Sequence, residues 1–235
     1  MQPVVNARNL VTRYGSFTAV DGLSFEVQSG ECFGLLGPNG AGKTTTIRMV
    51  CATSPVTSGE LAVDGKDARS SGRQVRQVIG VVPQEDDLDT DLTVLWNLII
   101  HARFFGFSNA EARRLAEETL ERVQLADRQN SEIDSLSGGM KRRLAIGRAL
   151  LTRPRLVLVD EISEGLQPAM VARLQQVLTE ERRARGLTVV LVEQNVGFAL
   201  ALADRYAVLK VGTVVETGRT ADVGARERIE RHLVL

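Results

Sequence analysis

Short apolar runs recur along the chain and are separated by stretches with helical periodicity. Three of the runs are rich in Val or Ile and lack polar alternation, which is typical of strands that are buried on both faces of a parallel sheet. These three runs and a fourth, less β-branched one are IGVVP (79–83), LVLVD (156–160), TVVLVE (188–193) and ECFGLLG (31–37).

Helical patterns follow two of these runs. One pattern covers 42–50. The other covers 168–185, with Pro168 at its start and Gly186 just past its end, which are the positions where these residues favour the beginning and the end of a helix. The alternation of strands and helices predicts an α/β core.

Residues 108–151 have a helical pattern without an intervening strand. Ser108 and Glu111 match a capping box, and apolar residues recur after them near helical spacing. A second helix is expected after Ser137. The pattern therefore predicts a helical insertion between two strands of the sheet.

The N-terminal part of the chain predicts a small antiparallel sheet, because its apolar stretches are bounded by turn-forming dipeptides. The expected strands are 4–11, 18–27 and 60–64, and the expected turns are Ser58-Gly59 and Asp64-Gly65.

Composition narrows the class of protein. The chain has 235 residues, of which 43% are hydrophobic, and this is enough for one sizeable core. Lysine plus arginine is 29 and aspartate plus glutamate is 29, so the chain lacks the positive excess that favours nucleic-acid binding. Two cysteines, Cys32 and Cys51, do not suggest a disulfide framework, and the cytosol is the expected compartment.

The sequence does not predict a membrane span. Its most apolar segment, 92–107, is interrupted by Asn97, His101 and Arg103 and is shorter than the ~20 apolar residues that a span needs. The first residues, MQPVVNARNL, lack the apolar stretch of a signal peptide. We therefore expect a protein that does not cross a membrane by itself but can dock on one that does.

The stretch GPNGAGKTT (37–45) follows an apolar run and opens a helical pattern. It fits G-x-x-x-x-G-K-[ST] through Gly37, Gly42, Lys43 and Thr44. Glycines let backbone N–H groups surround a phosphate, Lys43 reaches the β- and γ-phosphates, and the Thr44 hydroxyl can ligate Mg²⁺. The strand before and the helix after favour this P-loop over a chance glycine-rich turn.

The run LVLVD (156–160) ends in a carboxylate, Asp160, and a second carboxylate, Glu161, follows directly. Burial of an unpaired carboxylate is unfavourable, and a Mg²⁺ ion beside Asp160 would offset it. We expect Glu161 to point elsewhere, because side chains alternate along a strand, and to activate an attacking water as general base. A carboxylate pair that only caps a helix is the alternative.

Over about residues 3–219 the chain resembles the nucleotide-binding subunit of ATP-binding-cassette (ABC) transporters. The most specific element is LSGGM (136–140), which is similar to the signature motif of that family. The resemblance implies a P-loop NTPase (RecA-like) core with a small antiparallel β subdomain and an α-helical subdomain inserted at about 85–153. A short C-terminal helical tail would cover 220–235.

The resemblance also implies the cofactors, ATP and Mg²⁺, and the residues that hold them. Tyr14 in RYG resembles the aromatic residue that stacks on adenine, with Val20 beneath the base, although a surface tyrosine is the alternative. Gln84 resembles the glutamine that touches Mg²⁺ and senses the membrane partner, and Gln194 stands where the family contacts the γ-phosphate. The expected catalytic residues are Glu161, Gln84, Gln194 and Lys43. The expected metal ligands are Thr44, Gln84 and Asp160. The expected nucleotide-binding residues are Tyr14, Val20, Gly37, Pro38, Asn39, Gly40, Ala41, Gly42, Lys43, Thr44, Thr45, Ser137, Gly138 and Gly139.

The signature motif provides a second anion site on the same chain. Ser137 is a candidate N-cap, while Gly138 and Gly139 leave backbone N–H groups open at a helix N-terminus. The family resemblance implies a head-to-tail dimer in which each ATP lies between the P-loop of one subunit and the signature of the other. The implied partners are a second nucleotide-binding subunit, identical or different, and an integral membrane permease, with the chain peripheral at the cytoplasmic face of the membrane.

The segment 92–107 falls where the family receives a coupling helix from its permease. Docking there would account for the clustering of Trp96, Phe104, Phe105 and Phe107 in a chain with few aromatic residues. Burial in the core of the helical subdomain is the alternative for the same residues.

Three positions depart from the family pattern. Ile162 and Gln167 stand where proline and aspartate are usual, and Gln194 stands where histidine is usual. Glutamine can donate a hydrogen bond but cannot carry the charge of a proton, so slow or absent hydrolysis is an alternative.

The two halves of the chain resemble different branches of the family. IGVVPQEDDLDTDLTVLWNL and MKRRLAIGRALL resemble the drug and lipo-oligosaccharide exporters, whereas VEQN and SEGLQP resemble the branched-chain amino acid and urea importers. We expect an ATPase that powers transport, and we favour export of a drug or lipid-like cargo over import. Alternatives of other classes are a soluble ATPase clamp on DNA or ribosomes, which the zero net charge disfavours, and an ATP-binding regulator without turnover.

Overall fold

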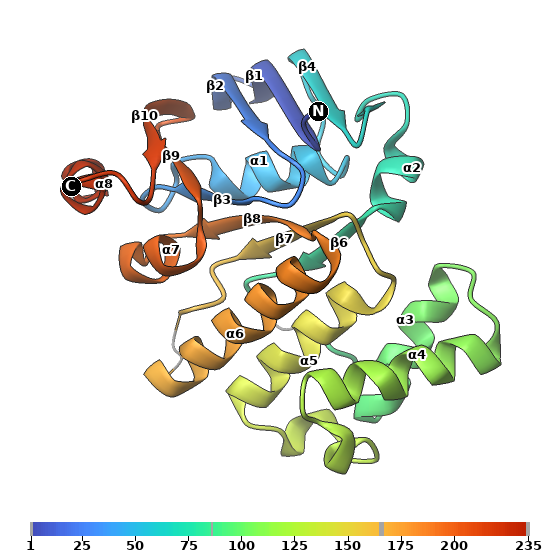
Figure 1. Ribbon diagram of the computed structural model, residues 1–235. Helices are drawn as coiled ribbons and strands as arrows, with labels where there is room; N and C mark the ends of the chain where they lie inside the picture. The colour runs from blue at the N-terminus through green and yellow to red at the C-terminus, as the bar shows by residue number, and fades with distance from the viewer. Residues whose placement is uncertain (1, 86, 165–166, 234–235) are drawn as a thin grey trace.

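The computed structural model describes residues 2–85, 87–164 and 167–233 (Figure 1). Its strands are β1 (Val5–Tyr14), β2 (Phe17–Val27), β3 (Cys32–Leu36), β4 (Ser58–Val63), β5 (Lys66–Asp67), β6 (Ile79–Val82), β7 (Leu156–Asp160), β8 (Thr188–Glu193), β9 (Arg205–Lys210) and β10 (Thr213–Arg219). Its helices are α1 (Lys43–Val50), α2 (Gly72–Gln77), α3 (Val94–Phe104), α4 (Asn109–Arg122), α5 (Gly138–Leu151), α6 (Pro168–Arg185), α7 (Val196–Leu202) and α8 (Ala225–Leu233), with short 3₁₀ turns at Ala126–Arg128 and Ile133–Ser135.

The larger sheet is the predicted parallel sheet. Its strand order in the described part of the chain is β10-β9-β3-β8-β7-β6, and only β10 pairs antiparallel. The strands β3, β7 and β8 are buried throughout, as their unbroken apolar runs predicted. The strand β6 differs, because it lies at the edge of the sheet and leaves Val81 exposed.

The smaller sheet is antiparallel, with the order β2-β1-β4-β5. Asp64 and Gly65 form the turn between β4 and β5, as expected, and both have positive φ. The prediction of a turn at Ser58-Gly59 is wrong, because both residues lie inside β4. A Cβ on Gly59 would lie 2.2 Å from the Asn9 carbonyl oxygen, where the β1–β4 register shifts, so this glycine accommodates a bulge rather than a turn.

The helix boundaries follow the predicted caps. The Ser108 hydroxyl accepts the backbone N–H of Glu111, and the Glu111 carboxylate accepts the Ser108 N–H, which completes the capping box of α4. Pro168 is the first residue of α6, and Gly186 ends that helix in the left-handed conformation.

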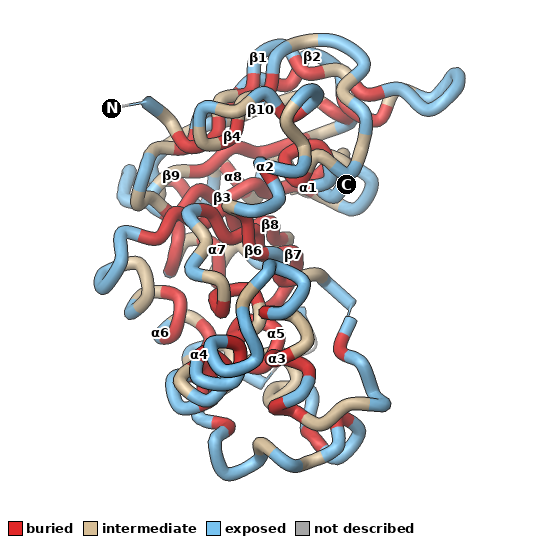
Figure 2. Tube along the Cα trace, turned by 90° about the vertical axis from the view of Figure 1, so that its right-hand side faces the viewer, coloured by how far each residue is buried: buried red, intermediate tan, exposed pale blue. Residues whose placement is uncertain are grey.

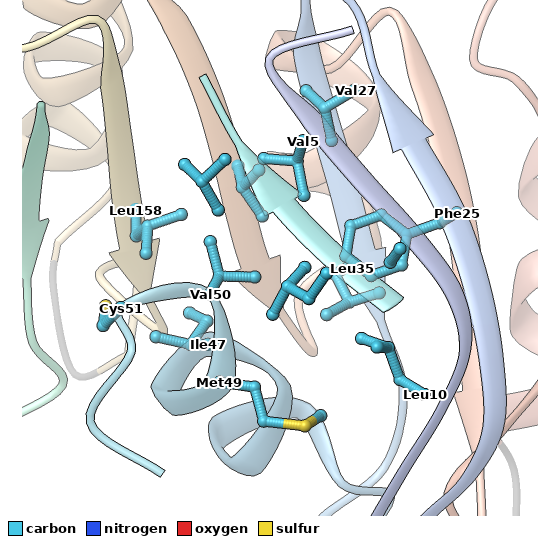
Figure 3. Close-up of a cluster of buried hydrophobic side chains, with 14 of the residues drawn as sticks. Val5, Leu10, Phe25, Val27, Leu35, Ile47, Met49, Val50, Cys51 and Leu158 are labelled. Carbon is cyan, nitrogen blue, oxygen red and sulfur yellow. The ribbon is translucent and has the colours of Figure 1, made fainter. Parts of the chain in front are cut away.

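The main hydrophobic core lies between the two sheets and around α1. Ile47, Met49 and Val50 of α1 pack among residues such as Leu35 of β3 and Leu10 of β1 (Figure 3). A second cluster joins the other face of the parallel sheet to α5, α6, α7 and α8. In Figure 2 buried residues concentrate at the strands in the middle of the molecule, and exposed residues lie at its rims. The two clusters hold the parallel sheet in place from both sides.

A third cluster lies among α3, α4 and α5, where the helical subdomain is expected. The aromatic residues of 92–107 differ in burial. Phe107 packs against this cluster, whereas Trp96, Phe104 and Phe105 remain at the surface with 46%, 84% and 37% exposure. The boundaries of the subdomain at about 85–153 stay a prediction, and the last two residues of the expected C-terminal tail lie outside the described residues.

His101 in α3 gives this region a pH dependence. Burial, together with a smaller effect of Arg148, lowers its pKa to about 4, while Asp87 opposes the change. Between pH 6.5 and about 4 the unfolded chain therefore binds a proton that the folded chain does not, so stability falls as the pH falls through this window. We expect His101→Gln to lose less thermal stability than the parent between pH 7 and 4. Melting curves should differ by several °C, since about 1 kcal/mol shifts Tm by roughly 2–4 °C at this size.

The control is His232→Gln, at the second histidine of the chain, in α8. The same protection against acid in both variants would contradict the assignment to His101.

Candidate functional site

The predicted P-loop connects β3 to α1, as its motif requires. Gly42, which precedes α1, has φ +100°, and a Cβ there would lie 2.7 Å from the Ala19 carbonyl oxygen. Only glycine fits this conformation and this contact. The Gly212 N–H, from the β9–β10 turn, donates to the Ala41 carbonyl, so the loop is also held from outside.

Lys43 points back across this loop and is 5% exposed. Its ammonium donates to the carbonyl oxygens of Gly37 at 2.8 Å and Pro38 at 3.0 Å. It also lies 3.1 Å from Glu161 Oε1. The cation of the P-loop thus contacts the carboxylate that the sequence predicted as general base.

Glu161 lies just beyond the end of β7 and has φ +46°. Its N–H donates to the Val192 carbonyl at 2.9 Å. The expectation that strand alternation directs its side chain is wrong, because the residue is outside the strand. A left-handed backbone conformation, uncommon for a non-glycine residue, sets its direction instead.

Three side chains donate to the Glu161 carboxylate. Besides Lys43, the Gln194 amide donates to Oε1 at 2.9 Å and the Gln84 amide donates to Oε2 at 2.9 Å. Gln84 also donates to Glu164 at 3.1 Å, and Gln194 donates to Asn39 of the P-loop at 2.7 Å. The structure therefore brings together all four residues predicted to be catalytic, Lys43, Gln84, Glu161 and Gln194.

Asp160, the last residue of β7, is 7% exposed, and its Oδ1 has no hydrogen-bond partner among the described residues. Burial, and to a lesser degree the neighbouring Glu161, raises the pKa of this carboxyl to about 6, while Lys43 opposes both. Asp160 lines a cavity of about 630 Å³ together with Thr44 and Gln84. A buried acceptor without a donor, beside a hydroxyl and an amide, fits a site for a hard cation with oxygen ligands.

A second, smaller cavity of about 220 Å³ lies over the P-loop. It is lined by Phe17, Ala19, Asn39, Gly40, Gly42, Lys43, Thr44, Thr45, Gln84 and Glu161. Neither Tyr14 nor Val20 lines it; Tyr14 is 46% exposed and bonds to Ser54, and Val20 is fully buried.

Phe17 faces Tyr14 across the β1–β2 hairpin and is 66% exposed. This aromatic residue of the cavity was not predicted from the sequence. The stretch YGSF, with glycine in a two-residue loop, carries the hairpin signal that could have revealed it.

The signature residues lie apart from both cavities. The Ser137 hydroxyl caps α5 by accepting the Met140 N–H, as predicted. Gly138 is exposed, and a Cβ at this position would meet open space. A Cβ at Gly139, by contrast, would meet the Met170 side chain at 2.4 Å.

Two of the three positions that depart from the family pattern have ordinary structural roles. Ile162 is fully buried in the cluster beneath β7 and α6, and Gln167 precedes Pro168 at the start of α6 without a side-chain cap. Two residues of SEGLQP, Gly165 and Leu166, lie outside the described residues. Gln194 makes the contacts with Glu161 and Asn39 that were given above.

Comparisons with known proteins agree with this geometry. Residues 20–164 match the family described as ABC transporter. The Nod factor export ATP-binding protein I of Burkholderia orbicola is 41% identical over 218 residues, which cover 91% of this chain and 70% of the relative.

Solved structures of cassettes have the same fold. The structure of cbiO1 from Clostridium perfringens superimposes with a TM-score of 0.88 at 24% identity, over 98% of this chain and 94% of that one. The cassette MJ0796, in a dimeric post-hydrolysis state bound to ADP and Pi, gives a TM-score of 0.83 at 27% identity, over 93% of this chain and 99% of that one. The chain thus belongs to the ABC transporter family and is an ATP-binding subunit with the ATPase activity of that family.

Proposed function

We propose that this chain hydrolyses Mg-ATP to power export of a solute through a membrane permease. The observation that carries the reaction is the convergence of Lys43, Gln84 and Gln194 on the Glu161 carboxylate beside the P-loop. The 41% sequence identity to a Nod factor export ATP-binding protein supports export. Import remains the alternative, because the motifs VEQN and SEGLQP resemble importers.

Asp160, Thr44 and Gln84 would hold Mg²⁺. The unpartnered Oδ1 of Asp160 supports this assignment, as does the shared cavity of the three residues. The ion would neutralise negative charge on the β- and γ-phosphates. The backbone of the loop 37–42 and the N-terminus of α1 would bind the same phosphates through N–H groups.

Glu161 would act as the general base. Phosphates in the P-loop would attract the Lys43 ammonium away from the Gly37 and Pro38 carbonyls and from Glu161 Oε1. The released oxygen would accept a proton from a water molecule as the water oxygen attacks the γ-phosphorus, and ADP would leave with the bridging electron pair. Gln194 would orient this carboxylate with one amide hydrogen, would redirect the other from Asn39 to the γ-phosphate, and would take no proton.

Replacing Glu161 with glutamine tests the base. Glu161→Gln should bind ATP within a few-fold of the parent affinity but lower kcat by about 10²–10⁴-fold, the usual contribution of a general base. Phosphate release at saturating Mg-ATP measures the rate, and a fluorescent nucleotide measures binding. The control is Glu164→Gln, since Glu164 shares the Gln84 donor but is exposed. Parental turnover in Glu161→Gln would refute the assignment, and absence of turnover in the parent would favour the regulator without hydrolysis.

Two copies would form two complete sites. Ser137, Gly138 and Gly139 do not line the P-loop cavity of their own chain as described, which supports a contribution of the signature to a partner subunit. The dimeric state of the MJ0796 cassette supports the same arrangement.

Substitution of Gly138 tests the dimer. Gly138→Asp should preserve the fold, because its Cβ meets open space and an acidic residue suits a helix N-terminus. Its carboxylate would repel the phosphates of the partner's nucleotide. We expect Glu161→Gln to form an ATP-dependent dimer in size-exclusion chromatography and the double variant Glu161→Gln/Gly138→Asp to remain monomeric with ATP binding intact. A dimer of undiminished stability in the double variant would exclude this role of the signature.

The cavity of about 630 Å³ that contains the proposed Mg²⁺ ligands is also, along its wall at β6 and α3, the proposed docking groove for the permease. It is lined in part by Val81, Gln84, Glu85, His101 and Phe105. Gln84 lines it while bonding to Glu161, so movement of a docked segment would reach the base. No helix in the described residues is long and apolar enough to span a membrane. We propose that its permease holds the chain at the cytoplasmic face of the membrane.

Phe105→Ser tests this groove. Phe105 is 37% exposed, and its ring centre lies 5.1 Å from that of His101, with the two rings tilted by 44°. The parent should co-purify from gently solubilised native membranes with a polytopic membrane protein in fixed ratio, identified by mass spectrometry, and Phe105→Ser should recover at least several-fold less of it. The control is Val223→Ser, at an apolar residue that is 97% exposed and lies just before α8. Equal recovery from both variants would refute the groove, and recovery with ribosomes or DNA would favour the soluble clamp.

A further inference from the structure

A second buried carboxylate, Glu193, lies beside the Glu161 network. It is the last residue of β8, directly before Gln194, and it is 2% exposed. Its Oε1 accepts the Ser163 N–H at 3.0 Å, and its Oε2 accepts the Ser163 hydroxyl at 2.9 Å. Both oxygens of this carboxylate are therefore bound to one residue of the neighbouring loop.

Ser163 belongs to the segment that carries Glu161. Hydrogen bonds before and after the Glu161 side chain connect this segment to the end of β8. On one side the Glu161 N–H donates to the Val192 carbonyl, and on the other side Ser163 donates twice to Glu193. The left-handed conformation of Glu161 is unfavourable for a non-glycine residue and persists only where its surroundings hold it.

The same strand end carries Gln194, which donates to Glu161. The pair Glu193–Ser163 thus joins the two segments whose side chains meet at Glu161 Oε1. Packing alone does not explain a carboxylate here, because an apolar residue of similar volume is often as stabilising as a buried charge. Burial raises the pKa of Glu193, and the hydrogen bonds from Ser163 and Asn195 oppose this.

We propose that Glu193 is a positioning residue for ATP hydrolysis, which through Ser163 holds the loop that carries Glu161 in register with Gln194. It contacts neither nucleotide nor water in this role. The inference rests on the proposed function of Glu161 as general base.

Two substitutions at Glu193 separate positioning from charge. Glu193→Met keeps the length of the side chain and removes both acceptors. Glu193→Gln can keep both contacts, because its amide oxygen accepts the Ser163 N–H while its amide nitrogen donates to the Ser163 hydroxyl oxygen. We expect kcat for phosphate release to fall about tenfold to a hundredfold in Glu193→Met, with ATP affinity and KM within about threefold, and to recover largely in Glu193→Gln.

Ser163→Ala is the milder probe, since it removes one hydroxyl and keeps the N–H. It should lower kcat with parental ATP affinity, and combined with Glu193→Met it should add little further loss, because both changes break the same contact.

The matched control is Thr188→Val at the other end of β8, where the buried hydroxyl accepts the Gly30 N–H at 3.0 Å. Loss of a purely structural contact should lower Tm without changing kcat. We expect this result for Thr188→Val and not for the variants of Glu193 and Ser163.

Parental kcat in Glu193→Met overturns the inference. If Glu193→Met does not fold, parental kcat in Ser163→Ala overturns it as well. Equal loss of kcat in Glu193→Gln and Glu193→Met would show that charge, not register, matters. Glu161→Gln, measured in parallel, keeps the two proposals apart: turnover there refutes the general base itself, whereas an inactive Glu161→Gln beside a fully active Glu193→Met refutes only the positioning role.

Discussion

The burial of two adjacent carboxylates at the end of β7 is the constraint on which the site depends. A buried acceptor without a partner costs about 1–3 kcal/mol, and a buried charge costs more. Glu161 avoids this cost because Lys43, Gln84 and Gln194 donate to it. Each donor comes from a different segment of the chain, so one carboxylate fixes the relative positions of four segments.

The topology of the sheet makes this convergence possible. The strands β3, β8, β7 and β6 are neighbours and parallel, so their carboxyl ends meet at one edge. The residues beyond these ends are the P-loop, Gln194, Glu161 and Gln84, in the same order across the sheet. This is the edge at which open α/β sheets bind their ligands. Cores on both faces of the sheet keep the four ends in register.

The apolar runs and capping residues were enough to predict β1–β4, β6–β8, the helices α1, α4, α5 and α6, and the P-loop, but β5, β9 and β10 were not predicted. The order of the strands was not visible, because local patterns do not reveal that β8 lies between β3 and β7. Ser58-Gly59 was misread as a turn, since a glycine in a bulge and a glycine in a turn look alike in sequence. The direction of Glu161 and the bidentate contact of Glu193 depend on one backbone conformation beyond the strand end. Neither feature could be predicted, because both depend on how the segment after β7 lies against the end of β8, and these segments are far apart in the sequence.

The charges of the site support the proposal that it binds a magnesium nucleotide rather than a free anion. The phosphates of a bound nucleotide would attract Lys43 away from Glu161. The two neighbouring carboxylates and the phosphates would then share the positive charge of one lysine. The pKa of Asp160 is raised chiefly by burial and further by this crowding of negative charge beside Glu161. A histidine at the position of Gln194 could relieve it by protonation, but glutamine supplies donors without charge. The compensating charge must therefore come with the ligand, and the unpartnered oxygen of Asp160 lies where a divalent cation would supply it.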